Sequence, residues 1–255
     1  MIKLQRKLVE KPWGRTELPA MFGWTGGRRI GEVWFTGGGD LPLLAKYIFT
    51  SERLSIQVHP NDQQARERGL RHGKSECWAI LDAEPGATIG LGLKREVGKD
   101  ELRAAALDGS IEELIDWRPV SPGDFVFVPS GTVHAIGAGI SLLEFQQNAD
   151  VTYRLYDYGR PRELHLDDGI SVSNTGPFSG RIEHVAKAGK VLVDGPHFTL
   201  IQSSGDALEA RLRWVMPLQG NASGAGPGEC LLVEPGERIE ASVDADLLIG
   251  ATSQS

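Results

Sequence analysis

Apolar and polar residues alternate in many short runs along this chain, as they do in β-strands that bury one face. Glycine and proline, with 32 and 14 residues, separate most of these runs. Many short strands closed by such turns predict an all-β sandwich or barrel. The expected strands span residues 43–49, 54–58, 76–81, 88–91, 125–128, 133–136, 140–146, 152–156, 191–193, 198–203, 211–217, 231–233 and 246–250.

Two segments depart from this pattern and predict helices. Residues 62–68 form the first, and residues 99–116 form the second, in which apolar positions recur at helical spacing across a break at Gly109 and Ser110. We interpret both as short helical insertions in a sheet protein.

A polar stretch around residues 170–180 suggests a division of the chain. We expect a larger domain over residues 1–172 and a smaller C-terminal β lobe over residues 180–255. A turn sequence, Ser121-Pro122-Gly123-Asp124, has a weak echo at residues 234–237. The eleventh residue after the turn glycine is His134 in the first copy and Leu247 in the second. If the lobes are related, the second is a degenerate copy without the chemistry of the first.

Charge and composition exclude several classes of protein. The 255 residues carry a net charge of -7 and a pI near 5.4, which argues against a nucleic-acid binder. No apolar run approaches the ~18 residues of a membrane span, and no secretion signal is evident, so we expect a cytoplasmic protein. Cys77 and Cys230 are too few for a disulfide framework, and we interpret both as reduced thiols in strands. The oligomeric state stays open.

Residues 54–62, LSIQVHPND, form the first stretch with candidate chemistry. Alternation places Ser55, Gln57 and His59 on one face of a short strand, and Pro60 ends the strand. Taken alone, this is also the pattern of a half-buried strand whose polar side faces water.

Residues 123–137, GDFVFVPSGTVHAIG, form the second stretch. A turn glycine, an outgoing strand, a Pro-x-Gly hairpin and His134 on the returning strand give the spacing G-x5-P-x-G-x2-H. This resembles the second motif of the cupin superfamily, double-sheet jelly rolls that hold a metal inside the barrel. The usual first motif, His-x-His followed closely by Glu, is replaced here by Gln57-Val58-His59 and by Glu76, seventeen residues on.

These four side chains form a coherent ligand set. Two imidazoles, one carboxylate and one amide oxygen make an N/O shell that suits a borderline divalent ion. Closure of a barrel would bring Glu76 and His134 to the interior that Gln57 and His59 face. Each residue alone has a structural explanation, and the joint spacing favours the metal site.

A longer set of segments, in order and spacing, resembles the short bacterial form of type I mannose-6-phosphate isomerase. The family resemblance implies a cupin jelly-roll barrel with a second, reduced cupin-like lobe. It also implies one Zn²⁺ per chain, a sugar-phosphate substrate, and interconversion of mannose 6-phosphate and fructose 6-phosphate. It implies that the zinc ligands are Gln57, His59, Glu76 and His134. The segments are KPWG, IGEVWF, LPLLAKYIF, LSIQVHPND, GKSECW and VPSGTVHAIGAGISLLEFQQNADVTYRLYDYGR.

The resemblance also implies roles for residues around the metal. Lys46 and Ser55 match positions near the phosphate, and Lys74 and Arg154 match cationic positions of the active site. One departure is Gly159, where many relatives carry an acid. The large helical domain of the longer enzymes is a second feature that this sequence lacks.

The reaction passes through a cis-enediol and needs a group that moves a proton between C2 and C1. We expect Glu144 or Lys74 to transfer it, although Glu144 could equally orient Arg154 or a ligand histidine. Arg154 offers a planar fork to phosphate or enediolate oxygens. We also expect Trp13 and Glu32 to line the sugar-binding site, unless they serve only the core.

Two other functions fit part of the pattern. His59, Glu76 and His134 also satisfy the two-histidine, one-carboxylate triad of a non-haem iron oxygenase. The fourth ligand, Gln57, and the cations for phosphate argue against an oxygenase. The second alternative is a non-catalytic sugar-binding cupin. The presence of all four metal-ligand residues argues against it, because sugar binding alone would not need them.

Overall fold

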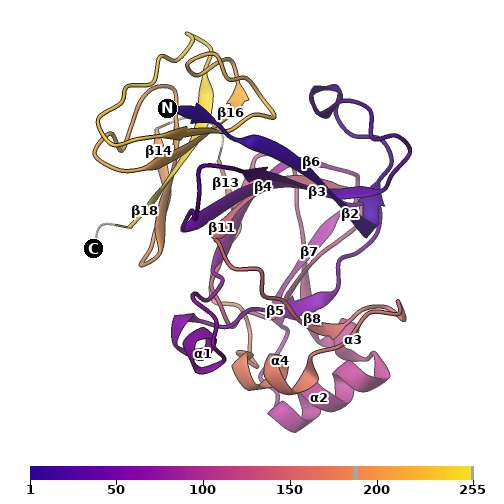
Figure 1. The fold of residues 1–255 in the computed structure, drawn as a ribbon. Helices are drawn as coiled ribbons and strands as arrows, with labels where there is room; N and C mark the ends of the chain where they lie inside the picture. Colours follow the sequence, from indigo (N-terminus) through magenta and orange to yellow (C-terminus); the bar gives the residue numbers. More distant parts are fainter. Residues whose placement is uncertain (186–188, 254–255) are drawn as a thin grey trace. The chain divides into compact units, whose positions relative to one another are not determined.

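A computed structural model describes residues 1–185 and 189–253 of the chain, and it confirms a protein made mostly of strands with few helices (Figure 1). Two compact units form. The first comprises Met1–Ile48, Leu143–Gln147 and His184–Ser255, and the second comprises Phe49–Leu142 and Asn148–Glu183. The strands β11 (Ile140–Gln147) and β13 (Glu183–His184) run through both units. The division into a 1–172 domain and a 180–255 lobe stays a prediction.

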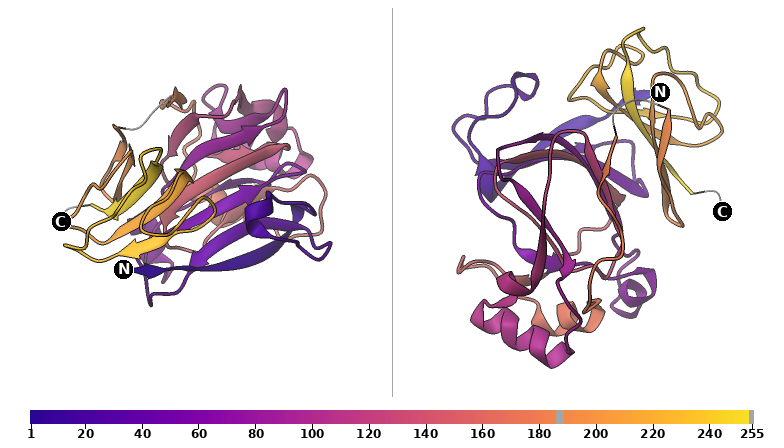
Figure 2. Two further views of the ribbon diagram at one scale, coloured as in Figure 1. Left: turned by 90° about the horizontal axis from the view of Figure 1, so that it is seen from above. Right: turned by 180° about the vertical axis from the view of Figure 1, so that it is seen from behind.

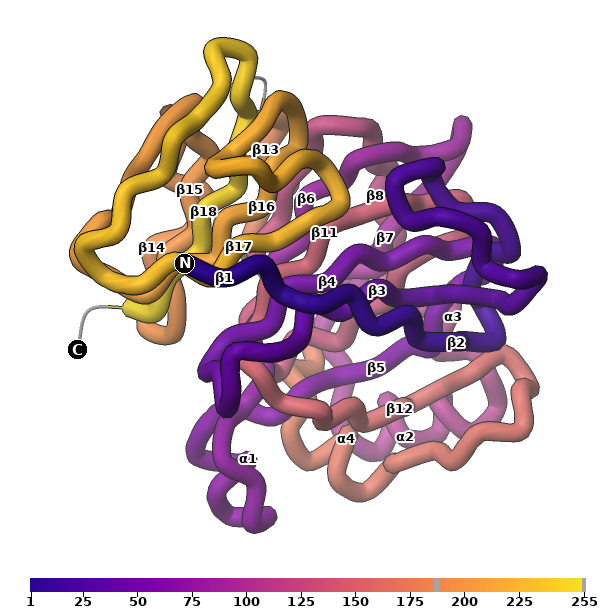
Figure 3. Tube along the Cα trace, turned by 45° about the horizontal axis from the view of Figure 1, so that its top comes forward, coloured from indigo at the N-terminus to yellow at the C-terminus, as the bar shows by residue number. Residues whose placement is uncertain are grey.

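A six-stranded antiparallel sheet joins the N-terminus to the C-terminal part of the first unit. Strand β1 pairs with β17, and Ile2 lies opposite Leu232 (Figure 3). The order across the sheet is β1 (Ile2–Lys3), β17 (Leu231–Val233), β16 (Arg213–Gln219), β18 (Asp246–Thr252), β15 (Phe198–Ser203) and β14 (Lys190–Asp194). Five of these strands match predictions to within two residues. The β16 prediction (211–217) lies two residues early at each end, and β1 was not predicted.

The first unit also holds three neighbouring antiparallel strands, β2 (Gln5–Arg15), β3 (Ile30–Thr36) and β4 (Leu43–Phe49), with a 3-10 helix η1 (Ala20–Phe22). Sequence patterning missed β2 and β3. Five of the eleven residues of β2 are exposed and two are buried, whereas β3 is buried almost throughout, so neither shows the alternation of a half-buried strand.

The second unit contains a five-stranded sheet and two further antiparallel strands that pair with each other, β6 (Glu76–Ala83) and β9 (Asp124–Val128). All but β8 were expected. The prediction that the second helix extends to residue 116 is wrong, because residues 115–116 begin β8. The order across the sheet is β12 (Tyr153–Tyr156), β5 (Ile56–Val58), β10 (His134–Ile136), β7 (Thr88–Leu93) and β8 (Ile115–Pro119).

Four helices belong to the second unit: α1 (Asp62–Glu67), α2 (Lys99–Asp108), α3 (Ile111–Leu114) and α4 (Leu166–Val172). The expected break at Gly109 is confirmed, because its φ of 87° is left-handed and ends α2. Helix α1 begins with a capping box between Asn61 and Gln64. Helix α4 was not predicted.

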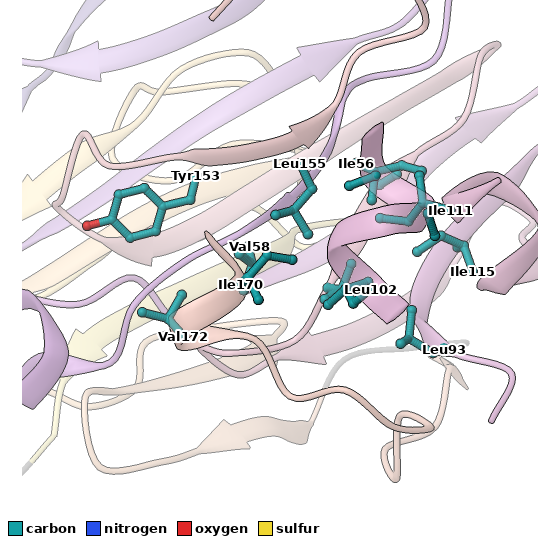
Figure 4. Packing of buried hydrophobic residues seen from close by; sticks show 14 of the residues in the cluster. Ile56, Val58, Leu93, Leu102, Ile111, Ile115, Tyr153, Leu155, Ile170 and Val172 are labelled. Atoms are coloured by element: carbon teal, nitrogen blue, oxygen red, sulfur yellow. The ribbon is translucent and has the colours of Figure 1, made fainter. Parts of the chain in front are cut away.

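The helices α2, α3 and α4 share an apolar core with β5 and β12. They gather at one end of this unit (Figure 2), and Ile56 and Val58 point into the cluster between them (Figure 4). Both side chains are fully buried. Because neighbours along a strand alternate faces, Gln57 must take the opposite face of the sheet.

The C-terminal strands of the first unit enclose an apolar interior. Leu247, the counterpart of His134 in the weak repeat, is buried there among Val215, Leu231 and Ile249. The turn glycines of the two copies, Gly123 and Gly236, have φ of 90° and 83°. The described part of the chain has no helix with the length and apolar character that crossing a membrane requires.

Candidate metal centre

A row of side chains crosses three adjacent strands of the second unit. Arg154 on β12 lies opposite Gln57 on β5, and Gln57 lies opposite His134 on β10. Residues directly opposite each other in an antiparallel sheet share a face, so these three side chains stand on the face away from the helices. His59 follows two positions after Gln57, and its carbonyl accepts from the amide of Gly131 at 2.8 Å.

Glu76, the first residue of β6, meets both imidazoles. Its Oε2 lies 3.3 Å from His59 Nε2, and its Oε1 lies 3.3 Å from His134 Nε2. The candidate ligand atoms of the three residues all lie within 4.8 Å of one another. Each of the three residues is only 1% exposed. The structure therefore brings together His59, Glu76 and His134, as the sequence spacing predicted.

The hydrogen bonds of His134 fix which nitrogen faces Glu76. Its Nδ1 lies 2.8 Å from the Thr132 carbonyl oxygen, to which only an N–H can donate. In the neutral ring, Nε2 then carries a lone pair, and this lone pair faces a carboxylate oxygen. Two acceptors in contact repel each other unless a cation lies between them, so the donor set fits a divalent metal.

The protonation states of His59 and Glu76 also suit metal binding. Burial, with a contribution from the Lys74 ammonium, lowers the pKa of His59 to about 3, so its imidazole is neutral near pH 7. Burial alone would raise the pKa of Glu76. The nearby Lys74 ammonium instead holds that pKa well below its ordinary range, and the contact with His59 adds to this effect. Neutral imidazoles and an ionised carboxylate are the forms that ligate metals.

Lys74 contacts the same candidate ligand atoms of His59 and Glu76. Its Nζ is 3.0 Å from His59 Nε2 and 3.0 Å from Glu76 Oε2, and the residue is 6% exposed. Lys74 precedes β6, and its amide donates to the Pro60 carbonyl at 3.0 Å. The buried carboxylate thus attracts one positive charge from the chain itself.

Gln57 is placed by its neighbours. The Ser55 hydroxyl donates to Gln57 Oε1 at 3.2 Å, and Gln57 Nε2 lies 3.2 Å from His134 Nε2. A metal ligand would have to be the amide oxygen, which requires a half-turn of the amide so that the oxygen lies beside His134. The structure therefore places Gln57 at the centre but turns its nitrogen toward it.

Arg154 is held by the chain that follows β12. Its Nη1 donates to the Glu163 carbonyl at 2.6 Å. Its Nε is buried and has no hydrogen-bond partner among residues 1–185 and 189–253. Burial, followed by repulsion from Arg162, lowers the pKa of Arg154 below its ordinary value.

Three further predicted residues form a buried charged cluster in the first unit. Lys46 Nζ lies 2.8 Å from Glu144 Oε1 and 3.9 Å from Glu32 Oε2. The indole of Trp34 also donates to Glu32. Trp13 is buried in the same unit. That these residues share one site with the metal ligands stays a prediction.

Comparison with known proteins gives this geometry a context. No protein-family model matches the chain. A curated mannose-6-phosphate isomerase of Streptococcus mutans is 41% identical over 169 residues, which is 62% of this chain and 53% of that protein. Mannose-6-phosphate isomerase ManA of Bacillus subtilis is 49% identical over 143 residues, which is 53% of this chain and 45% of that protein. The chain thus spans about half the length of the curated relatives it matches.

A solved structure extends the likeness over the whole fold. The crystal structure of a Bacillus subtilis mannose 6-phosphate isomerase matches with a TM-score of 0.85 and 27% identity, over 97% of this chain and 98% of that one. In sequence and in fold, this chain is similar to mannose-6-phosphate isomerases. The predicted resemblance and the predicted cupin fold are both confirmed.

One residue escaped the sequence reasoning. Asp157 is 2% exposed and accepts from Arg162 and Arg160, which close a loop beside Arg154. A signal was present, since Asp157 is the single acid among the three arginines of RLYDYGRPR. The departure at Gly159 has a conformational reason, because its φ of 78° lies in the left-handed region that glycine adopts without strain.

Proposed function

We propose that this chain is a zinc-dependent aldose-ketose isomerase that interconverts mannose 6-phosphate and fructose 6-phosphate. The observation that carries the proposal is the buried set His59, Glu76 and His134, with Gln57 and Arg154 in one row beside it. The names of the relatives supply the substrate class. The cytoplasmic location expected from the sequence is part of this proposal.

Four residues would hold one zinc ion: Gln57, His59, Glu76 and His134. His134 Nε2 and Glu76 Oε1 lie 3.3 Å apart, and in the neutral ring this is a contact between two acceptors that a cation would relieve. When bound, zinc would supply a redox-inert Lewis acid for the negative charge that develops on the sugar oxygens.

Lys74 is our candidate for moving the proton between C2 and C1. It is the buried cation of the centre, and its Nζ already contacts a ligand nitrogen and a ligand oxygen. As the neutral amine, Lys74 would take the proton from one carbon of a substrate held beside the metal ligands, and the ammonium so formed would return it to the other carbon. Glu144, the other residue expected from the sequence, remains the alternative.

Arg154 would bind an anionic oxygen of the substrate. Its Nε is a buried donor with no partner in the described residues, and charged donors that await an acceptor suit phosphate or enediolate oxygens. Ser55 lies 3.2 Å from Gln57 and would contact the phosphate. A similar role for Lys46 rests on the sequence resemblance, and Trp13 and Glu32 would line the sugar-binding site.

A coupled assay of fructose 6-phosphate formation from mannose 6-phosphate tests the proposal. We expect turnover by the protein as purified, loss of turnover after treatment with a chelator, and recovery when Zn²⁺ is added. Turnover that is unaffected by thorough metal removal would contradict the proposed chemistry.

The same triad of ligands is compatible with a non-haem iron oxygenase, so the assay is paired with metal analysis and oxygen uptake. We expect no substrate-dependent oxygen consumption. Bound iron together with oxygen consumption would replace the isomerase by the oxygenase. Binding of mannose 6-phosphate without turnover would favour a sugar-binding cupin.

A further inference from the structure

We propose that Asp157 is a positioning residue for Arg154, which it controls through Arg162 and the segment 157–165. The inference rests on the proposed function only in that Arg154 is taken to bind the substrate. The geometric claim, that a buried ion pair fixes the guanidinium, stands on the contacts of the second unit alone.

The Asp157 carboxylate accepts hydrogen bonds from two guanidinium groups. Arg162 binds it in bidentate fashion, with Nε 2.6 Å from Oδ2 and Nη2 2.7 Å from Oδ1. Arg160 Nη1 reaches Oδ1 at 3.0 Å. The carboxylate is 2% exposed, and a bidentate pair between a guanidinium and a carboxylate fixes the geometry of both groups.

The segment 157–165, which Asp157 anchors, contacts both the side chain and the backbone of Arg154. Glu163 directly follows Arg162, and its carbonyl accepts from Arg154 Nη1 at 2.6 Å. At the backbone, the amide of His165 donates to the Arg154 carbonyl at 2.8 Å. The Arg154 amide in turn donates to His165 Nδ1 at 3.3 Å. The position of the guanidinium therefore depends on where residues 162–165 lie.

A tight turn starts this segment. Tyr158 and Gly159 have φ of 55° and 78°, and the Arg160 amide donates to the Asp157 carbonyl at 3.0 Å. A left-handed tyrosine is strained and persists only when its surroundings fix it. Arg160 supplies part of that constraint, because its Nη2 donates to the Arg53 carbonyl at 2.7 Å.

The consequence concerns which donor of Arg154 is left for substrate. The Glu163 carbonyl occupies Nη1, whereas Nε is buried without a hydrogen-bond partner in the part of the chain that the structure describes. A donor fixed before the substrate arrives need not be ordered during the reaction. Loss of the Asp157 charge would release Arg162 and allow the guanidinium to move.

The kinetic test compares Asp157→Asn with a matched control. We expect D157N to lower kcat/KM for mannose 6-phosphate on the order of 10²-fold, the effect of a small misplacement, with unchanged metal content. In an Arg154→Lys background the same change should have little further effect, because it acts through Arg154. The control Asp167→Asn breaks the exposed Arg103–Asp167 pair of 2.6 Å and should leave activity unchanged.

A second variant avoids dependence on the folding of D157N. Arg162→Lys keeps the positive charge but loses the bidentate fork. Arg162→Lys should reduce kcat/KM in the otherwise wild-type protein and have no effect in the Arg154→Lys variant. If D157N is not recovered folded, R162K decides the question by the same comparison.

A spectroscopic readout separates this proposal from the proposed activity. The Nε–Hε signal of Arg154 in ¹⁵N NMR spectra, assigned by its loss in Arg154→Lys, should shift or broaden in D157N and R162K and stay in place in D167N. An unchanged Arg154 signal, or an equal loss of kcat/KM in both backgrounds, would overturn the positioning role. A wild-type protein without isomerase activity would instead overturn the proposed function, while the NMR comparison would still decide the role of Asp157.

Discussion

At the scale of single residues, the tautomer of His134 links the sequence to the proposed chemistry. The residue lies after a Pro-x-Gly hairpin that reverses the chain, and the carbonyl of Thr132 in that hairpin fixes its Nδ1–H. The other nitrogen must then face Glu76 as an acceptor. One backbone hydrogen bond therefore orients a ligand before any metal binds.

Removing the side chain of a metal ligand should have a different effect from removing that of a substrate-binding residue. His134→Ala should lose both the metal and turnover, because it deletes a ligand. Arg154→Ala should keep the metal and lose turnover by about 10²- to 10³-fold, the effect of removing one donor to developing charge. Metal content by mass spectrometry and the coupled assay measure both. A metal-free Arg154→Ala protein would show that Arg154 supports the metal centre rather than the substrate.

The cysteines give a second prediction at this scale. Cys77 lies in β6 as expected, whereas Cys230 directly precedes β17, and both are buried. Burial also raises the pKa of the Cys230 thiol, which keeps it protonated near neutral pH. Neither thiol should react with a disulfide reagent in the native protein, and both should react in denaturant. Rapid reaction of one thiol without denaturant would mean that its surroundings open in solution.

At the scale of elements, the sequence located most strands to within two residues but missed those without alternation. The β5 strand was predictable because Ile56 and Val58 enter an apolar core while Gln57 takes the other face. Strand β3 was not, since both of its faces are buried. The seven-residue α4 was missed as well, and its fold depends on packing against β12 rather than on a local pattern.

Helix α1 offers a test of local stabilisation. The Asn61 side chain accepts from the amide of Gln64 at 2.9 Å, and the Gln64 side chain accepts from the amide of Asn61 at 3.0 Å. Asn61→Ala should therefore lower the free energy of unfolding by about 1 kcal/mol. Gln63→Ala, on the exposed face of the same helix, is the control and should change it by less than ~0.5 kcal/mol. Urea unfolding measures both, and equal effects would deny the capping box its role.

At the scale of the whole molecule, the C-terminal strands enclose an apolar interior in which Leu247 is fully buried. That the two lobes are related stays a prediction. The sequence predicts that, if they are related, Leu247 stands where the first copy has His134. It could not predict Asp157, because that residue acts by contacts among arginines that only the folded loop brings together.

Leu247 should therefore matter for stability and not for the metal. Leu247→Ala leaves a cavity in a packed interior, which costs about 2–5 kcal/mol and should lower the melting temperature clearly. Zinc content at low temperature should equal that of the wild type. A variant with normal stability but reduced zinc content would mean that this lobe contributes to the metal centre.

The central claim is that one metal ion, held by His59, Glu76, His134 and Gln57, enables the isomerisation. The most direct test is a titration of chelator-treated protein with Zn²⁺, in which the rate of fructose 6-phosphate formation is followed at each addition. We predict that the rate rises from near zero and reaches a plateau at one equivalent of zinc per chain. A rate that is already maximal before zinc is added, with no metal detectable in the protein, would contradict the account.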